Sequence, residues 1–324
     1  MVSKYFQINN PFLQGFFPLV LGVLWWSLEW TSFSGEVIGN KWFELIRTEN
    51  HFVNNALGFV LVNWAAIKFN RLLDTAGIVT QFRFLPGLVL LFFFSLDQQV
   101  MGLTPLVLGL VPLMYAIQVI LKLNNKGEIH RFVFLAGLFL GLAGLLYPPF
   151  FLLVFTFPVI ITLIRGWAFR YFFWNLFGVL FPLYMVGGIE FSLTGELNFL
   201  KGVFISPRII TVELAPAFGL EMWKMYALLS VVILTSVIGV VAFLRIRQLA
   251  VLKIQQRMAA VLILFIPFYL LFAAGYFMGQ GYQLALLALP VGYLLNYWIS
   301  YQSNPILRDV AFLLFFGTLI TIAL

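Results

Sequence analysis

The chain is organised as a series of long apolar runs separated by short polar links. A helix needs about 20 apolar residues to cross the hydrocarbon core of a bilayer. Eight runs have about this length and are clear candidates for spans: 11–31, 53–73, 103–123, 169–189, 221–245, 258–277, 281–300 and 306–324. Shorter or interrupted runs are 79–96, 131–147 and 149–164. The pattern therefore predicts an all-α polytopic membrane protein of about eleven transmembrane helices.

Two of these runs meet at a tight corner. The link between 131–147 and 149–164 is Tyr147-Pro148-Pro149, which is too short and too rigid for any longer connection. Two short spans and a re-entrant hairpin both fit this pattern. Because the runs come as a pair, the orientation of every later segment is the same in either case.

The charged residues give an independent test of this arrangement. If the links alternate between the two sides, starting with Lys4 inside, fourteen of the nineteen basic residues fall inside with three acids, and five fall outside with nine acids. Cytoplasmic loops are enriched in Lys and Arg. The N-terminus is therefore predicted to be cytoplasmic and the C-terminus extracytoplasmic.

The same alternation predicts one integral membrane domain over residues 1–324. Residues 191–220 form an extracytoplasmic loop in this arrangement, and residues 221–324 form four C-terminal helices. Hydrophobic residues make up 62% of the chain and charged residues 10%, which is too little polar surface for a soluble fold.

Composition also excludes several classes of function. The chain has no cysteine, so disulfides and thiolate metal sites are excluded. The net charge of +7 comes from small basic groups between apolar runs and not from one polar face, so we expect no nucleic-acid partner. No glycine-rich phosphate loop is present, which argues against a nucleotide-driven pump. The expected partner is membrane lipid.

The candidate catalytic residues are acids on the predicted outer side. Glu36, Glu44 and Glu49 lie in the loop 32–52, and Asp97 begins the second outside loop. Carboxylates at a membrane boundary can bind a divalent cation or act as a general base. The alternative is that they only solvate short loops. The outside basic residues that would contact a lipid phosphate are Lys41, Arg47 and Arg208.

Polar and small residues inside the apolar runs have structural interpretations. Lys68 is expected to extend its ammonium group toward the cytoplasmic surface. Asn63 and Asn175 are candidates for hydrogen bonds between helices. The glycines of the segment LAGLFLGLAGLLYPP, residues 135–149, are spaced as small faces that let helices approach closely.

These landmarks resemble the membrane half of the GT-C superfamily, the polyprenyl-phosphate-sugar-dependent glycosyltransferases. The matching features are the loop 32–52 with its acids, then Asp97, and then the glycine-rich helix and corner at 137–155. The likeness covers residues 1–190 and is one of topology. It implies transfer of a sugar from a polyprenyl-phosphate donor on the extracytoplasmic face, with one of the four acids as base or metal ligand.

The chain also departs from that superfamily. It has no Asp-Glu pair after the first helix, Tyr147 replaces the common basic residue at the corner, and no large extracytoplasmic domain follows. The Tyr-Pro-Pro corner is similar to that of uncharacterised multi-pass inner-membrane proteins of the Bacteroidota. This second resemblance implies a location in the bacterial inner membrane and brings no established activity.

Two other functions fit the sequence. A non-catalytic scaffold or assembly component, for the cell envelope or for secretion, would use its apolar faces to bind other membrane proteins and needs no acid. A transporter is the third hypothesis. The scarcity of charges within the spans argues against it, because such charges usually handle coupling ions.

Reporter fusions test the predicted orientation. Alkaline phosphatase fused within residues 190–220 should be active, because the enzyme folds only outside the cytoplasm, whereas a fusion within residues 246–252 should be inactive. Green fluorescent protein at the same two positions should give the opposite pattern. A cytoplasmic location for residues 190–220 would invert the whole arrangement.

Overall fold

The computed structural model describes residues 16, 18–19, 22–23, 51–78, 82–96, 102–123, 129–166, 169–196, 222–277, 284–302 and 304–323. All the regular elements within these ranges are helices. The predicted run 11–31 lies mostly outside them, although its few described residues are helical. The long outside loop predicted at 191–220 lies beyond the described residues from 197 onward.

The helices follow the predicted apolar runs closely. In chain order they are α4 (His51–Thr75), α5 (Leu85–Leu96), α6 (Pro105–Leu121), α7 (Ile129–Leu146), the 3₁₀ helix η2 (Pro148–Phe155), α8 (Thr156–Arg165), α9 (Phe169–Thr194), α11 (Met222–Leu249), α12 (Leu252–Phe277), the 3₁₀ helix η3 (Leu284–Leu287), α13 (Ala288–Tyr301) and α14 (Pro305–Ala323). Every predicted run from residue 53 onward coincides with one helix or with two consecutive ones.

Seven helical segments among the described residues are long and apolar enough to cross a membrane. They are Phe52–Thr75, Ile129–Leu146, Pro148–Arg165, Phe169–Thr194, Tyr226–Leu249, Leu252–Ala273 and Leu284–Tyr301. The helices α5 and α6 are apolar but have only 12 and 17 residues. The described part of this membrane protein is therefore all helical and has seven candidate spans, which does not reach the predicted eleven.

The lengths of α7, η2 and α8 bear on whether the proline corner joins two spans or forms a re-entrant hairpin. α7 has 18 residues, and η2 continues directly into α8 to make a second apolar segment of 18 residues. The corner itself is closed by two backbone hydrogen bonds, from Tyr147 N–H to the Ala143 carbonyl and from Phe150 N–H to the Tyr147 carbonyl. Two segments that are each long enough to cross favour two spans over a re-entrant hairpin.

One predicted link proved to be helical. The sequence placed the segment 246–257 between two spans, but α11 continues to Leu249 and α12 already begins at Leu252. The segment is rich in Arg, Gln, Lys, Leu and Ile, which are favourable or neutral in helices. Long basic side chains also allow a helix to continue beyond the hydrocarbon, because their charged ends reach water.

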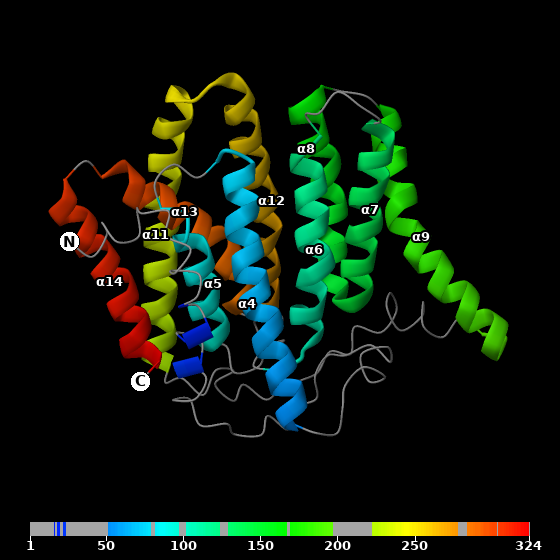
Figure 1. Ribbon diagram of the computed structural model, residues 1–324, viewed down its shortest axis with the longest axis horizontal. Coiled ribbons are helices and arrows are strands. Elements are labelled where there is room, and N and C mark those ends of the chain that lie inside the picture. Colours follow the sequence, from blue (N-terminus) through cyan, green and yellow to red (C-terminus); the bar gives the residue numbers. More distant parts are fainter. Residues whose placement is uncertain are drawn as a thin grey trace.

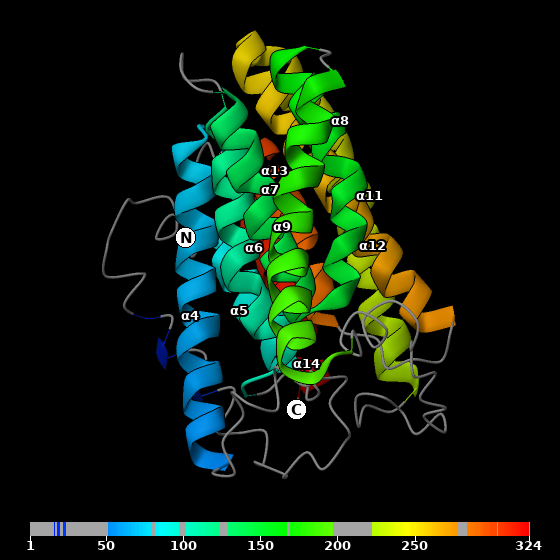
Figure 2. The same ribbon diagram turned by 90° about the vertical axis from the view of Figure 1, so that its right-hand side faces the viewer.

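The helices stand roughly side by side and alternate in direction (Figure 1). The α11–α12 link lies at the upper end in Figure 1 and also in the view turned by 90° (Figure 2). The C-terminal half of α9 diverges from its neighbours toward the lower right (Figure 1). The described chain therefore runs back and forth along the bundle.

Glycines set the close packing of α7 against α9. A Cβ atom added at Gly137 would lie 2.2 Å from the Asn175 carbonyl oxygen, and one added at Gly178 would lie 2.3 Å from the Phe134 carbonyl oxygen. Such contacts leave no room for a side chain. The predicted role of the glycines in residues 135–149 is thereby confirmed at the α7–α9 contact.

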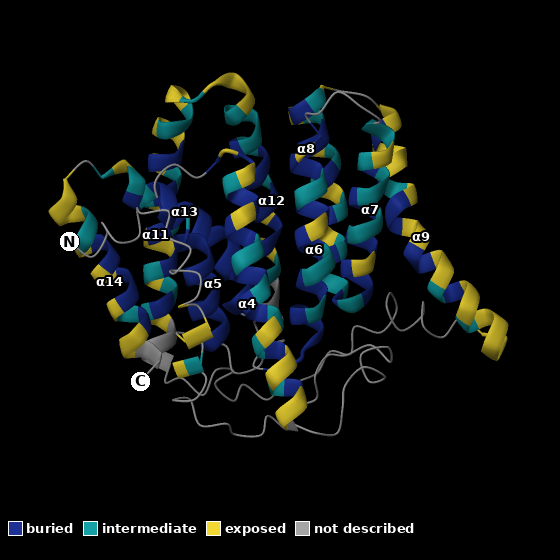
Figure 3. Ribbon diagram, viewed as in Figure 1, coloured by how far each residue is buried: buried dark blue, intermediate teal, exposed yellow. Residues whose placement is uncertain are grey.

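Two short helices, α5 and α13, form the centre of the bundle. All residues of α5 are buried, and most of α13 is buried as well, which appears as dark blue ribbon in Figure 3. The two helices contact each other closely, since a Cβ atom at Gly292 would lie 2.9 Å from the Pro86 carbonyl oxygen. The core therefore sits where the N-terminal and C-terminal parts of the chain meet.

The glycine contact predicts a position-specific loss of stability along α9. Gly178→Ala should lower the free energy of unfolding by about 1–3 kcal/mol, because the added methyl group forces α7 and α9 apart. Gly188→Ala on the same helix is the matched control, because a Cβ atom at Gly188 meets nothing within 4 Å. Thermal unfolding of the detergent-solubilised protein measures both. Equal midpoints for the two variants would contradict the packing described.

Candidate functional site

The candidate catalytic and phosphate-contacting residues lie in the loops that the sequence predicts to be extracytoplasmic. None of them falls within the described residues: Glu36, Lys41, Glu44, Arg47, Glu49, Asp97 and Arg208. Their roles as base, metal ligand or phosphate contact stay predictions. The structure does describe the helix ends and the glycine contact to which two of these loops are attached.

The first turns of α4 make a tight backbone contact with the chain that leads into α6, just after the segment that contains Asp97. α5 ends at Leu96, and the next described residue is Gly102, which packs against the first turns of α4. A Cβ atom added at Gly58 of α4 would lie 2.1 Å from the Gly102 carbonyl carbon. Gly102 has a φ of 97°, a conformation that glycine adopts readily and other residues rarely adopt. The chain is therefore held against α4 directly after the segment that contains Asp97.

The start of α4 completes this junction. A Cβ atom added at Gly102 would lie 2.6 Å from the Asn55 Oδ1 atom, one turn into α4. α4 begins at His51, within the last two residues of the predicted loop 32–52. Asn55 therefore contacts the returning chain from the start of α4. We call these contacts among Asn55, Gly58 and Gly102 the glycine junction.

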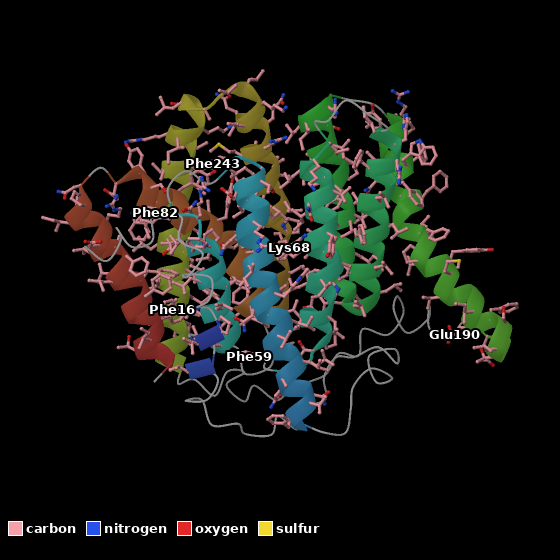
Figure 4. All side chains as sticks on the ribbon, viewed as in Figure 1. Phe16, Phe59, Lys68, Phe82, Glu190 and Phe243 are labelled. Carbon is pink, nitrogen blue, oxygen red and sulfur yellow. The ribbon has the colours of Figure 1, made fainter. Side chains whose placement is uncertain are left out.

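The two ends of the bundle differ in charge. The basic residues with described side chains all lie near links at one end, which we call the cation-rich end: Lys68, Arg71, Arg83, Lys122, Arg131, Arg165, Arg170, Arg245, Arg247, Lys253, Arg257 and Arg308. Glu190 and Glu196 lie at the opposite end of α9, where Figure 4 labels Glu190. Among the described helices, the backbone of Lys224 lies near the start of α11, away from this end.

The described residues do not supply a metal centre. Within the ranges that the structure covers, no group of three or more His, Cys, Asp or Glu residues is placed to hold a metal ion. The acid–base pair described at the cation-rich end is Arg83 Nε with Asp74 Oδ1, 3.3 Å apart, and both side chains are about two-fifths exposed. A solvated pair of this kind contributes little stability. The divalent cation expected for the outer loops stays a prediction.

Sequence reasoning missed a buried polar cluster around the link between α4 and α5. Two side chains donate to carbonyl groups of this link. The Tyr297 hydroxyl donates to the Ile78 carbonyl at 2.9 Å, and the Arg257 Nη1 atom donates to the Ala76 carbonyl at 3.1 Å. Ala76 and Ile78 are buried, and a buried backbone carbonyl group needs a hydrogen-bond donor. Helices α12 and α13 therefore supply the hydrogen bonds that the link cannot make internally.

The Asn70 side chain of α4 likewise forms hydrogen bonds with backbone groups at the start of α5. Its Oδ1 atom accepts the Gly87 N–H at 2.7 Å, and its amide nitrogen donates to the Phe84 carbonyl at 3.4 Å. The side chain is 2% exposed, so water cannot replace these bonds. One buried amide thus satisfies a free N–H group at a helix start and orients α5 relative to α4.

The aromatic part of this cluster lies between α11 and α13. Tyr293 and Tyr297 contact each other edge-on, with ring centroids 5.0 Å apart, and the Phe243 ring lies 5.4 Å from that of Tyr297. The Tyr293 hydroxyl donates to the Met258 carbonyl at 3.0 Å. The arrangement links α11, α12 and α13 to the α4–α5 link. We call Tyr293, Tyr297, Arg257 and Asn70 the polar joint.

A signal for the polar joint was present in the sequence. Tyr293, Asn296 and Tyr297 recur at helical spacing within an otherwise apolar run, which places them on one face. The other buried amides behave differently from the prediction. Asn63 donates to the Phe59 carbonyl of its own helix at 2.9 Å, and the side-chain atoms of Asn175 have no hydrogen-bond partner within the described part of the chain.

Removal of the Tyr297 hydroxyl should show how much the polar joint stabilises the α4–α5 link. Tyr297→Phe keeps the ring but leaves the Ile78 carbonyl without its donor, which costs about 1–3 kcal/mol for a buried group. Hydrogen–deuterium exchange of the α5 amides should accelerate as the link loosens. Tyr226→Phe, at an exposed position of α11, is the control. Unchanged exchange in the Tyr297 variant would mean that the hydrogen bond does not hold the link.

No protein-family model, curated protein or solved structure matches this chain. The resemblances drawn from the sequence therefore stay expectations. The described helices form a membrane protein with a cation-rich end, a buried polar joint and a glycine junction at the opposite end.

Proposed function

We propose that this membrane protein transfers a sugar from a polyprenyl-phosphate donor at the end opposite the cation-rich end, in the manner of the GT-C superfamily. The observation that carries the proposal is the glycine junction. It attaches the segment after Asp97 to the first turns of α4, and the chain enters α4 directly from the loop that contains Glu49. The junction therefore supports a shared site, because the segments that contain Asp97 and Glu49 both lead directly into it along the chain.

Chain length limits how far these acids can lie from the junction. Asp97 directly follows the end of α5 and lies five positions before Gly102, and Glu49 lies six positions before Asn55. An extended chain covers at most about 3.6 Å per residue, so each acid is tethered within about 20 Å of the junction. This supports a shared site for Asp97 and Glu49. Glu44 and Glu36 have progressively longer tethers.

The charge distribution supports an extracytoplasmic location for this site. Cytoplasmic loops attract Lys and Arg, and the described basic residues lie almost entirely at the end opposite the glycine junction. With the cation-rich end in the cytoplasm, the glycine junction faces the outside of the bacterial inner membrane, where polyprenyl-phosphate sugars are used by the resembling superfamily.

The proposed roles follow from the chemistry of the donor. Asp97 acts as the general base that takes the proton from the acceptor hydroxyl, or as a ligand to a divalent cation on the phosphate. Glu36, Glu44 and Glu49 are the alternative acids for these roles. Lys41, Arg47 and Arg208 contact the phosphate that leaves with the polyprenyl chain.

A non-catalytic scaffold is the second candidate, and α9 is the feature that favours it. The diverging half of α9 exposes large apolar side chains, such as Tyr184 at 76% and Leu193 at 80% (yellow in Figure 3). In a membrane such a face contacts either lipid or the helix of a partner protein. The scaffold needs no acid, so substitutions of the outer acids distinguish the two functions.

Substitution of Asp97 tests the proposed transfer. In a strain lacking the gene, the polyprenyl-phosphate sugar should accumulate and one sugar should be missing from an envelope glycan, both measured by mass spectrometry. The wild-type chain should restore the glycan. Asp97→Asn should lower the rate of transfer by about 100-fold or more, the usual contribution of a general base.

Glu190→Gln is the matched control, because it removes a carboxylate at the same end of the bundle but on α9, remote from α4 (Figure 4). It should leave transfer unchanged, and immunoblots should show equal amounts of both variants. Full transfer by Asp97→Asn and by Gln variants of Glu36, Glu44 and Glu49 would rule out the enzyme. Co-purification of a stable membrane partner would then support the scaffold.

A further inference from the structure

A second group of residues that the proposed function does not use lies at the cation-rich end. Trp64, Lys68 and Arg71 recur at helical spacing and share one face of α4, and Tyr115 and Lys122 share one face of α6. These two faces meet, because the Lys68 Nζ atom lies 4.4 Å from the centre of the Tyr115 ring. We call these five residues the α4–α6 face.

The α4–α6 face collects positive charge. Arg71 follows Lys68 by one helical turn on α4, and Lys122 follows Tyr115, whose ring Lys68 contacts, by two turns at the end of α6. The described acid on α4 is Asp74, and its carboxylate pairs with Arg83. Three cations therefore lie along the same face at this end of the bundle. Such a group is stabilised when an anion lies between its members.

Other cations at the same end are arranged differently. Arg257 donates to the Ala76 carbonyl at 3.1 Å, and Arg165 donates through Nε to the Leu123 carbonyl. Arg245 donates to the Tyr301 hydroxyl. These arginines are each engaged by a separate protein group, as expected of residues that only anchor the topology. Lys68 instead lies over the Tyr115 ring and shares its face with Arg71 and Lys122, which distinguishes this group from the separate arginines.

Aromatic rings extend the face toward the middle of the bundle. Lys68 lies seven residues before the end of α4, or about 10 Å along the helix axis, and Trp64 lies one turn deeper (Figure 4 labels Lys68). The Tyr115 ring lies 5.9 Å from that of Trp64 and is stacked on that of Phe139 at 5.6 Å. Tyr115 is 38% exposed, so part of this row is open to the surroundings.

We propose that the α4–α6 face binds an anionic phospholipid of the adjacent leaflet. The headgroup phosphate lies between Lys68, Arg71 and Lys122, and an acyl chain lies along Trp64, Tyr115 and Phe139. The order of groups along the face, cations at the end and aromatic rings deeper, matches the order of phosphate and hydrocarbon in a phospholipid. This site lies at the end opposite the glycine junction. The proposal of lipid binding is therefore independent of the proposal of sugar transfer.

Native mass spectrometry of the full detergent-solubilised chain, titrated with phosphatidylglycerol, tests the site. The affinity should fall about fivefold for each cation removed, since one Lys or Arg near an anionic lipid surface contributes about that factor. The double variant Lys68→Gln/Lys122→Gln should therefore bind about 25-fold more weakly than the wild type. The wild type should bind zwitterionic phosphatidylcholine more weakly than phosphatidylglycerol.

The double variant Arg170→Gln/Lys253→Gln is the matched control, because it removes two exposed cations at the same end from other helices. It should bind phosphatidylglycerol like the wild type. Lys122→Gln alone, at the exposed end of α6, gives a second test if removal of the more enclosed Lys68 impairs folding. Conservative Lys68→Arg should retain binding.

Three outcomes would overturn the proposal. The first is equal affinity of the Lys68→Gln/Lys122→Gln variant and the wild type. The second is an equal loss in the control variant, which would show a general effect of charge. The third is complete displacement of phosphatidylglycerol by inorganic phosphate at equal concentration, which would identify a site for free phosphate that makes no use of the acyl chain.

Discussion

A chain that crosses a bilayer has to satisfy its backbone polar groups within the protein. At the link between α4 and α5, where the helix is interrupted, side chains of distant helices supply the hydrogen bonds. The carbonyls of Ala76 and Ile78 receive hydrogen bonds from Arg257 and Tyr297, which lie about 180 and 220 positions further along the chain. The start of α5 receives two more from Asn70. The central position of α5 and α13 depends on these bonds, because without them the buried link would leave unpaired polar groups in an apolar core.

This constraint also explains how the two parts of the chain are joined. α5 comes from the N-terminal part and α13 from the C-terminal part, and they approach closely at Pro86 and Gly292. The glycine contacts between α7 and α9 achieve the same closeness at the other side of the bundle. In a membrane, burial of apolar surface does not favour helix contact over lipid contact, so tight backbone approach and buried hydrogen bonds have to supply the association energy.

The two ends of the helix bundle also differ in charge. The cation-rich end suits the cytoplasmic leaflet and its anionic lipids, and it holds the α4–α6 face. The opposite end holds the glycine junction, which the segments with Asp97 and Glu49 adjoin in the chain. The sites proposed for lipid binding and for sugar transfer are therefore assigned to opposite ends of the bundle.

The sequence alone determined which segments are apolar helices and at which end the basic residues gather, because length, hydropathy and charge are properties of the chain itself. It also indicated the glycine-mediated contact at residues 135–149. It did not show that α5 and α13 are central while α9 is peripheral, because a side chain that faces lipid and one that faces protein are equally apolar. The polar joint and the α4–α6 face were likewise decided by tertiary structure. Their residues lie far apart in the chain, and only the packing of the helices brings Asn70, Arg257 and Tyr297, or Lys68 and Lys122, together.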